Sequence, residues 1–125
     1  MLMAARSYPV RREPSELTDR ELAGRVYRQA GCARSHVDPD QWFPLAADTA
    51  KAREQAADAI AVCAACPVRA DCLELSLRHA ADLGAHGIWG GLVERERRSL
   101  RRRWLAGANV AEFLPAAPLT STRSR

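Results

Sequence analysis

Four cysteines constrain this chain more than any other feature of its sequence. They are Cys32, Cys63, Cys66 and Cys72, spaced C-x30-C-x2-C-x5-C, and the 125 residues contain no other cysteine. Thiolate sulfur is a soft ligand that selects iron–sulfur clusters, zinc or copper(I). The alternative use of four cysteines is a pair of disulfides, which belongs to oxidising compartments. Any fold must therefore bring one remote cysteine toward three that are close together in sequence.

The choice between a metal and disulfides depends on the compartment. The first twelve residues contain no apolar run of the kind that forms a signal peptide. No stretch approaches the length of a membrane span either. We therefore expect a cytoplasmic protein without a membrane partner, in which thiols stay reduced. That expectation favours a metal site over structural disulfides.

The length of the chain predicts a single domain with less ordered ends. Residues 1–14, with two prolines and scattered arginines, are interpreted as a mobile leader. Residues 15–107 form the expected domain, and residues 108–125 are expected to be a disordered tail. A domain of this size buries a modest fraction of its surface, so a metal would help to hold it together.

Helical periodicity and capping residues predict an all-α fold, a small bundle of about four helices around a four-cysteine iron–sulfur site. Ser15 is a good N-cap for the first helix, and Asp48 or Thr49 for the second. Pro67 is favoured as the first residue of the third helix. No segment shows the alternation of a strand. The predicted helices cover about residues 15–30, 48–62, 67–80 and 92–106.

The cysteine spacing favours an iron–sulfur cluster over zinc. Cys63 and Cys66 can face one point if a helix ends between them and another begins, and Cys72 looks back from that next helix. Cys32 follows the first helix, so a closed site would tie the first helix to the third. Structural zinc sites usually present two short pairs, whereas iron–sulfur sites commonly combine C-x2-C with a remote ligand. Zinc remains the main rival, and a redox dithiol at Cys63 and Cys66 is the third interpretation.

Other residues that could carry chemistry give weaker signals. His36, His79 and His86 are expected at the surface or in hydrogen bonds, since four sulfurs already complete a site. The sequence contains no Ser/His/Asp arrangement, no phosphate-binding glycine loop and no paired carboxylates. We therefore expect a protein that is not an enzyme and has no catalytic residues.

Positive charge is concentrated after the cysteines. Residues 94–103 hold six Arg against two Glu, whereas residues 32–93 hold five basic residues against eight acidic ones. Arginine presents a planar fork suited to phosphate and carboxylate. The segment is either a solvated helix face or a binding surface for nucleic acid or an acidic protein. Its arginines are Arg95, Arg97, Arg98, Arg101, Arg102 and Arg103.

Two further motifs complete a recognisable pattern. Residues 87–91 read Gly-Ile-Trp-Gly-Gly, and residues 42–44 read Trp-Phe-Pro. Together with the cysteine spacing and the arginine-rich segment, they resemble the WhiB family of actinobacterial regulators. The resemblance covers about residues 15–103, and the combination of motifs is specific.

The resemblance implies a cofactor, partners and site residues. It implies one [4Fe-4S] cluster per chain on the four cysteines, sensitivity to oxygen or nitric oxide, and a role in transcription regulation. Trp42, Phe43 and Trp89 would contact the C-terminal region of the principal sigma factor of RNA polymerase. The six arginines of residues 94–103 would contact promoter DNA. Loss of the cluster would free four thiols, which can form disulfides.

Two alternatives to this function stay open at this point. The chain could be a zinc-stapled module that binds sigma factor without touching DNA. The apo form could instead be a protein disulfide reductase that acts through Cys63 and Cys66.

Overall fold

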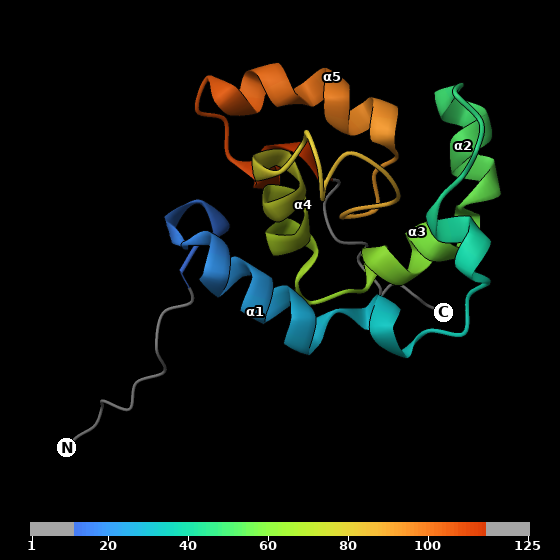
Figure 1. Cartoon of the computed structure of the whole chain (residues 1–125), viewed down its shortest axis with the longest axis horizontal. Helices are drawn as coiled ribbons and strands as arrows, with labels where there is room; N and C mark the ends of the chain where they lie inside the picture. The colour runs from blue at the N-terminus through green and yellow to red at the C-terminus, as the bar shows by residue number, and fades with distance from the viewer. Residues whose placement is uncertain (1–11, 115–125) are drawn as a thin grey trace, which may run out of the picture.

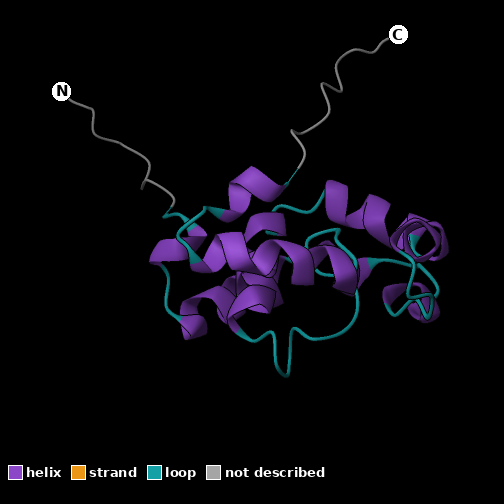
Figure 2. Cartoon of the chain, turned by 90° about the horizontal axis from the view of Figure 1, so that it is seen from above, coloured by secondary structure: helices purple, strands orange, loops and turns teal. Residues whose placement is uncertain are grey.

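The computed structural model describes residues 12–114, which form a bundle of short helices joined by turns (Figure 1 and Figure 2). Within these residues there is no strand, only an isolated bridge between Trp89 and Leu92, so the predicted all-α fold is confirmed. The α-helices are α1 (Asp19–Gln29), α2 (Thr49–Gln55), α3 (Ala57–Ala64), α4 (Arg69–Arg78) and α5 (Glu94–Leu105). The 3-10 helices are η1 (Pro14–Glu16), η2 (Gly31–Arg34), η3 (Pro39–Trp42) and η4 (Val110–Phe113).

The first α-helix begins later than predicted. Ser15, expected to be the N-cap, lies inside η1, and Thr18 caps α1 instead. The Thr18 hydroxyl accepts from the backbone N–H of Glu21 at 3.1 Å, and the Glu21 carboxylate accepts from the N–H of Thr18 at 2.9 Å. This reciprocal capping box satisfies two backbone donors. A cap at Ser15 would place Thr18 three residues on, where no carboxylate is available to complete the box.

The second predicted helix is split into α2 and α3 at Ala56. Asp48 caps α2, as predicted, but Ala56 leaves the helical region with φ −109° and ψ 19°. The side-chain oxygen of Gln41, on η3, accepts from the N–H groups of Asp58 at 2.9 Å and Ala59 at 3.1 Å. Gln41 therefore satisfies donors at the start of α3 that the break leaves without a helical partner.

Helix α4 is the central element, and α1 and α5 pack against it (Figure 1). Leu73 and Leu77 on one side of α4 are buried with Leu92, whereas Leu75 on another side is buried with Leu22 of α1. Because apolar side chains leave α4 in several directions, the helix is stable only when neighbours cover it on several sides. This packing holds α4, and the cysteine it carries, in the middle of the molecule.

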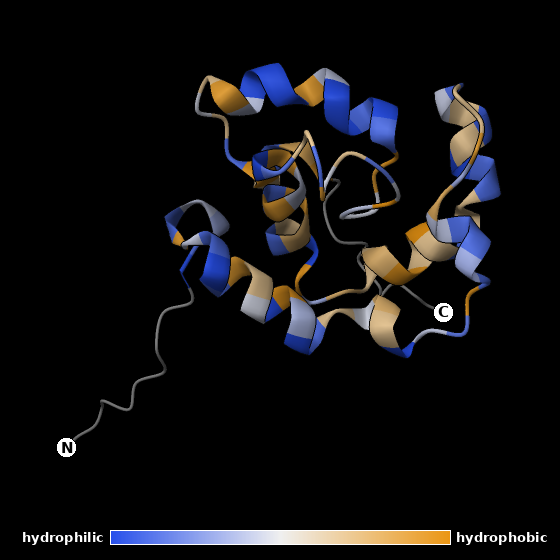
Figure 3. Ribbon diagram, viewed as in Figure 1, coloured by the Kyte–Doolittle hydropathy of each residue, from blue (hydrophilic) through white to orange (hydrophobic). Residues whose placement is uncertain are grey.

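Small side chains line the packed face of α2 and α3. Ala52, Ala56 and Ala59 are buried together with Cys63. In the hydropathy view, α3 is largely apolar, whereas α5 presents a broad hydrophilic surface (Figure 3). With 12 residues, α5 is the longest described helix, and none of the described helices is long and apolar enough to cross a membrane.

Charged side chains tie α1, α4 and α5 together. The guanidinium of Arg78 on α4 lies 2.9 Å from Asp19 of α1 and 2.9 Å from Glu74 of its own helix. Glu74 is only 4 % exposed, and it also accepts from the indole N–H of Trp104 on α5 at 3.1 Å. A buried carboxylate is tolerated when partners of this kind satisfy its charge and its lone pairs.

The described structure extends beyond the predicted domain at both ends. Pro14, assigned to the mobile leader, belongs to η1, and its carbonyl accepts a hydrogen bond from α4. Residues 108–114, assigned to the disordered tail, include η4, because Val110 is an apolar side chain that completes the core beside α4 and is 2 % exposed. The rest of both assignments, residues 1–11 and 115–125, lies outside the described residues.

Candidate metal centre and the surfaces around it

The four cysteines come together in one cavity although they belong to separate elements. Cys32 lies in η2, Cys63 in the last turn of α3, Cys66 in the connection to α4, and Cys72 in α4. All four line a cavity of about 190 Å³. Its wall is otherwise mainly apolar and includes Val26, Val62, Val68 and Ile88. The structure thus gathers the predicted ligand set, whose role in binding a metal stays a prediction.

Helix ends explain how the sulfurs reach one cavity. The N–H of Cys66 closes a turn on the carbonyl of Cys63 at 3.0 Å. Helix α4 begins at Arg69, two residues after the predicted start at Pro67. Cys66 therefore lies in a non-helical stretch that can orient its side chain. The backbone N–H of Gly31 donates to the sulfur of Cys66 at 3.4 Å. This contact holds the end of α1 beside the α3–α4 junction, which is the connection expected from the cysteine spacing.

Burial makes the thiols of Cys32, Cys63 and Cys72 weaker acids than an exposed cysteine. It raises the pKa of Cys63 to about 11 and that of Cys72 to about 12. Burial also raises the pKa of Cys32, and the neighbouring Cys66 acts in the same direction, so the sulfurs lie within electrostatic reach of one another. All four are free thiols in the structure. Because metals bind the thiolate form, metal binding here would release protons and would be weakened by acid.

Among the described residues, Arg69 is the one charged side chain in the wall of this cavity, and it was not predicted from the sequence. Its Nε donates to the carbonyl of Gly90 at 3.0 Å, and its positive charge lowers the pKa of Cys63 against the larger effect of burial. Gly91 has φ +81°, and a Cβ there would lie 3.3 Å from the Cβ of Cys63. A signal was available, since Arg69 precedes Cys72 by three residues and shares its helix face.

The three predicted aromatic residues surround a second, more open hollow. Trp42, Phe43 and Trp89 line a space of about 580 Å³ next to the cysteine cavity. Phe43 is 62 % exposed, and Leu83, which the sequence analysis did not single out, is 57 % exposed on the same hollow. An apolar side chain in a turn region was the available signal for Leu83. The group forms an apolar surface of the kind used in protein contacts.

The hollow and the cysteine cavity share part of their walls. Cys32, Trp42, Ile88 and Trp89 line both. The N–H of Ile88 donates to the carbonyl of Trp42 at 2.9 Å. This bond joins the glycine turn, residues 87–91, to η3. The indole N–H of Trp89 donates to the carbonyl of His86 at 2.8 Å. A displacement of the cavity wall would therefore reach the aromatic surface directly.

The histidines lie outside the wall of the cysteine cavity. Nε2 of His79 lies 3.1 Å from Asp19, and Nδ1 of His86 lies 3.6 Å from Glu94. His36 is exposed. These positions agree with the surface or hydrogen-bonded role predicted for them.

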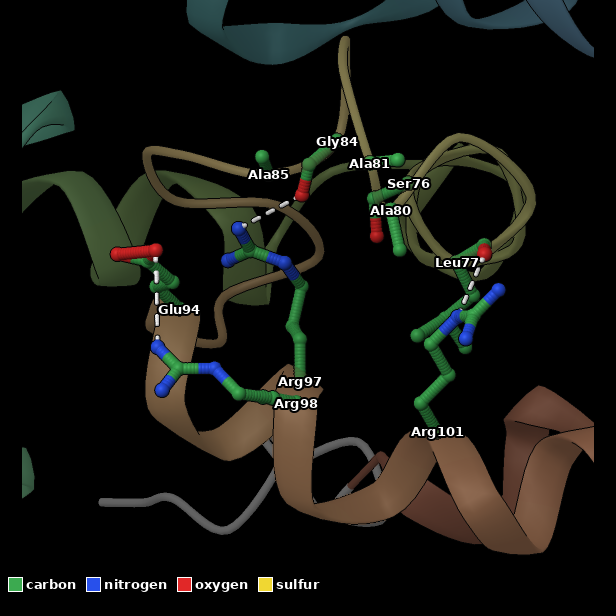
Figure 4. A pocket seen from close by; sticks show the side chains of 10 residues that line it. All are labelled: Ser76, Leu77, Ala80, Ala81, Gly84, Ala85, Glu94, Arg97, Arg98 and Arg101. Atoms are coloured by element: carbon green, nitrogen blue, oxygen red, sulfur yellow. Dashed lines mark hydrogen bonds and ion pairs between the residues drawn. The ribbon is translucent and has the colours of Figure 1, made fainter.

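Most of the predicted DNA-contacting arginines are exposed on α5. Arg98 lies 3.6 Å from Glu94, and a guanidinium N–H of Arg95 donates to the carbonyl of Ala47 at 3.3 Å. Arg101 is half-buried, and its Nε donates to the carbonyl of Leu77 at 3.4 Å (Figure 4). The exposed members are Arg95, Arg98, Arg102 and Arg103.

Arg97 does not belong to this exposed set, and the prediction that it contacts DNA is corrected by its position. Only 3 % of the surface of Arg97 is exposed, and its side chain points from α5 toward the preceding turn (Figure 4). Nη1 donates to the carbonyls of Gly87 at 2.6 Å and Leu92 at 2.7 Å, and Nη2 donates to Gly84 at 3.1 Å. Arg97 fastens the turn to α5 and is shielded from a phosphate.

The chain was compared with known proteins. Residues 27–100 match the sequence model of the family described as Transcription factor WhiB. The Transcriptional regulator WhiB1 of Mycobacterium tuberculosis is 44% identical over 66 residues, which cover 53% of this chain and 74% of that protein. A Transcriptional regulator WhiB1 of Bifidobacterium longum is 44% identical over 75 residues, 60% of this chain and 77% of that protein.

A third relative gives the same picture. The Transcriptional regulator WhiB of Streptomyces coelicolor is 42% identical over 74 residues, which cover 59% of this chain and 72% of that protein. The matched region of the family model contains the four cysteines, the aromatic residues of the hollow and the glycine turn.

Proposed function

The chain belongs to the WhiB family of transcription factors, and we propose that it regulates transcription by holding a [4Fe-4S] cluster on its four cysteines. The cluster would make the protein responsive to oxygen or nitric oxide. In this proposal the aromatic hollow binds the principal sigma factor, and the exposed arginines of α5 bind promoter DNA. The observation that carries the proposal is that every cysteine of the chain lines one cavity.

The donor set fits an iron–sulfur cluster better than a single zinc ion. Four soft sulfur donors in a mainly apolar cavity suit a cluster whose charge is spread over several atoms. Structural zinc sites usually present two short cysteine pairs. This chain has one C-x2-C pair, a further cysteine six residues on and one remote cysteine, a spacing that favours the cluster.

When bound, a [4Fe-4S] cluster supplies a redox couple and iron atoms that oxygen or nitric oxide can attack. The protein contributes the four thiolates, and the N–H of Gly31 donates to one of the sulfurs. Hydrogen bonds to sulfur and low solvent exposure both shift the reduction potential of such a site. The charge of Arg69 in the cavity wall partly balances the negative charge of the thiolates.

The aromatic hollow is the proposed contact for sigma factor. Phe43 and Leu83 supply exposed apolar surface, and Trp42 and Trp89 supply rigid walls that also bound the cysteine cavity. Aromatic side chains are typical of the residues that contribute most binding energy to an interface. The shared wall gives the cysteine site a direct way to alter partner binding.

The exposed arginines of α5 are the proposed contact for DNA. Guanidinium groups bind phosphate through paired hydrogen bonds, and contacts to phosphate carry no sequence information of their own. Such binding depends steeply on salt, because each neutralised phosphate releases counterions. Promoter selection in this proposal therefore comes mainly from the sigma partner.

The cluster is tested by anaerobic purification, with iron and sulfide analysis and optical and Mössbauer spectra. Each single Cys→Ala variant is expected to lose cluster retention, since every ligand is used. His36→Ala is the matched control, because this exposed histidine is not expected to be a ligand and should leave the cluster unchanged. A protein that carries one zinc per chain and no sulfide would contradict the proposal.

DNA binding is tested by the salt dependence of an electrophoretic shift, with and without sigma factor. The double substitution of Arg102→Gln and Arg103→Gln is expected to reduce the slope of log affinity against log salt by about two phosphate contacts. An unchanged slope would remove these arginines from the DNA contact.

Phe43→Ala is expected to weaken capture of sigma factor at least tenfold, as for a central aromatic contact.

A further inference from the structure

Two arginines, one from α4 and one from α5, hold the turn that joins these helices (residues 79–93). From α4, Arg69 donates to the carbonyl of Gly90 at 3.0 Å while its side chain forms part of the cysteine cavity. A Cβ built at Gly91 would lie 3.0 Å from Nη2 of Arg69, so the turn backbone packs directly on this guanidinium. Arg69 therefore touches the sulfur site and the turn at once.

From α5, Arg97 holds the same turn at three points. Its donors reach the carbonyls of Gly84, Gly87 and Leu92, so they hold the turn at points from residue 84 to residue 92. Burial lowers the pKa of Arg97 to about 10, so its guanidinium stays charged at neutral pH. Glu94 and Glu96 on α5 act on this pKa in the opposite direction, so neighbouring carboxylates offset part of the charge of Arg97.

The acceptors of both arginines on the turn are neutral carbonyls. A cation that is removed from water is costly unless a negative charge compensates it. Four thiolates around a cluster provide that negative charge next to the turn. Arg69, which forms part of the cavity wall, and the sulfur site should therefore stabilise each other, and Arg97 holds the same turn from α5.

We propose that Arg69 and Arg97 are positioning residues that couple the cysteine site to the turn carrying Trp89. This inference rests on the proposed function, because it needs a negatively charged cluster on the cysteines. With the cluster in place, the Arg69 guanidinium is fixed between the sulfur site and the carbonyl of Gly90, and Arg97 holds the same turn to α5. Without it, Arg69 loses the negative charge beside it, and the turn loosens. Trp89 then transmits the state of the cluster to the aromatic hollow.

The first test measures how fast the cluster is lost. Holoprotein is prepared anaerobically as wild type, Arg69→Gln and Arg69→Lys, and cluster absorbance is followed after exposure to air. Arg69→Gln is expected to speed the loss about tenfold or more, the usual effect of removing a partner of a metal ligand. Arg69→Lys keeps the charge and should fall between the two.

Neighbouring arginines on α5 supply the matched comparison. Arg97→Gln is expected to speed cluster loss in the same way, whereas Arg98→Gln removes an exposed charge from the same helix and should stay within about twofold of wild type. If Arg97→Gln does not fold, Arg97→Lys and the Arg69 variants still decide the question. Loss rates for Arg69→Gln equal to those for Arg98→Gln would overturn the inference.

The second test measures the turn itself. In wild type, hydrogen exchange of the Trp89 amide, which donates to Leu92 at 3.2 Å, should be slower with the cluster than without it. Arg69→Gln should abolish this difference, and Arg98→Gln should retain it. A difference that persists in Arg69→Gln would overturn the coupling.

Iron and sulfide analysis of the wild type separates the two proposals. A wild type that holds the cluster, with Arg69→Gln behaving like Arg98→Gln, contradicts only the coupling. A wild type that holds no cluster contradicts the proposed function and the coupling together.

Discussion

At the scale of single residues, Arg97 and Arg98 are neighbours in sequence and have different environments. The Arg97 guanidinium is buried against three backbone carbonyls, whereas the Arg98 side chain is exposed beside Glu94. Removing a buried donor leaves its acceptors without partners, and this costs more than the loss of a surface ion pair. The two residues therefore make a matched pair for stability measurements.

We expect Arg97→Ala to lower the free energy of unfolding by about 2–4 kcal/mol, because the carbonyls of Gly84, Gly87 and Leu92 lose the guanidinium donor and a cavity is left. Arg98→Ala should change it by less than about 0.5 kcal/mol. Urea unfolding under anaerobic conditions, followed by circular dichroism, measures both. Similar losses in the two variants would show that Arg97 is no more important to the turn than a surface charge.

The position of Arg97 could have been predicted from helical periodicity. Leu100, Val93 and Trp104 lie on the same helical stripe as Arg97, at spacings of three, four and seven residues. Arginine is normally exposed, so Arg97 is expected from its sequence neighbours to share their solvent-facing position. Its carbonyl acceptors come from a glycine-rich turn whose path depends on tertiary packing, so the hydrogen bonds themselves were not predictable.

At the scale of elements, the junction of α1 and α4 depends on one ion-pair network. The hydrogen bond from Arg78 is the main cause that lowers the pKa of Asp19 below its ordinary value of 3.8. A carboxylate with a lowered folded pKa stabilises the fold above its unfolded pKa, and this contribution is lost as pH falls through the folded value. The α1–α4 junction should therefore weaken in acid.

Asp19→Asn should reduce stability at pH 5 to 7, and the difference from wild type should shrink as pH falls below about 4 and disappear only below the folded pKa of Asp19, which is lower than 3.8. Chemical unfolding at several pH values measures this difference. Glu54→Gln, which neutralises an exposed carboxylate on α2, is the control. A deficit for Asp19→Asn that persists unchanged in strong acid would contradict the assignment to the ion pair.

The glycine turn is the element that joins the cysteine cavity to the rest of the molecule. Gly91→Ala and Gly107→Ala both put a side chain at positive φ, +81° and +107°, so they share the backbone strain. Only Gly91 packs on Cys63 and Arg69, whereas nothing lies within 4 Å of a Cβ at Gly107. We expect Gly91→Ala to destabilise more than Gly107→Ala and also to lower cluster retention, measured by iron content after anaerobic purification. Equal effects on both properties would contradict a close fit of the turn to the cysteine site.

The presence of the helices could be predicted from the sequence, but the residues at which they begin and end could be predicted less well. The α5 segment and the cap at Asp48 follow from periodicity and capping chemistry that act within a few residues. The split at Ala56 was not predictable, because Gln41 caps the start of α3 from 17 residues away. Thr18 was a better cap than Ser15 on local grounds alone, since Glu21 completes its capping box.

At the scale of the whole molecule, three surfaces meet around the turn between α4 and α5. The cysteine cavity lies on one side, the aromatic hollow shares its wall, and the basic helix α5 is tied to the turn by Arg97. This arrangement lets one chemical event at the cysteines affect two binding surfaces. The cysteine set followed from spacing, but the shared wall depends on how η3 and the turn pack, which no local pattern encodes.

The central claim is that the cavity lined by Cys32, Cys63, Cys66 and Cys72 holds a [4Fe-4S] cluster. Anaerobic purification followed by iron, sulfide and zinc analysis tests it most directly. The account predicts about four iron and four sulfide per chain, with colour that fades in air and is absent from each Cys→Ala variant. One zinc per chain without sulfide, or full cluster content in Cys32→Ala, would contradict it.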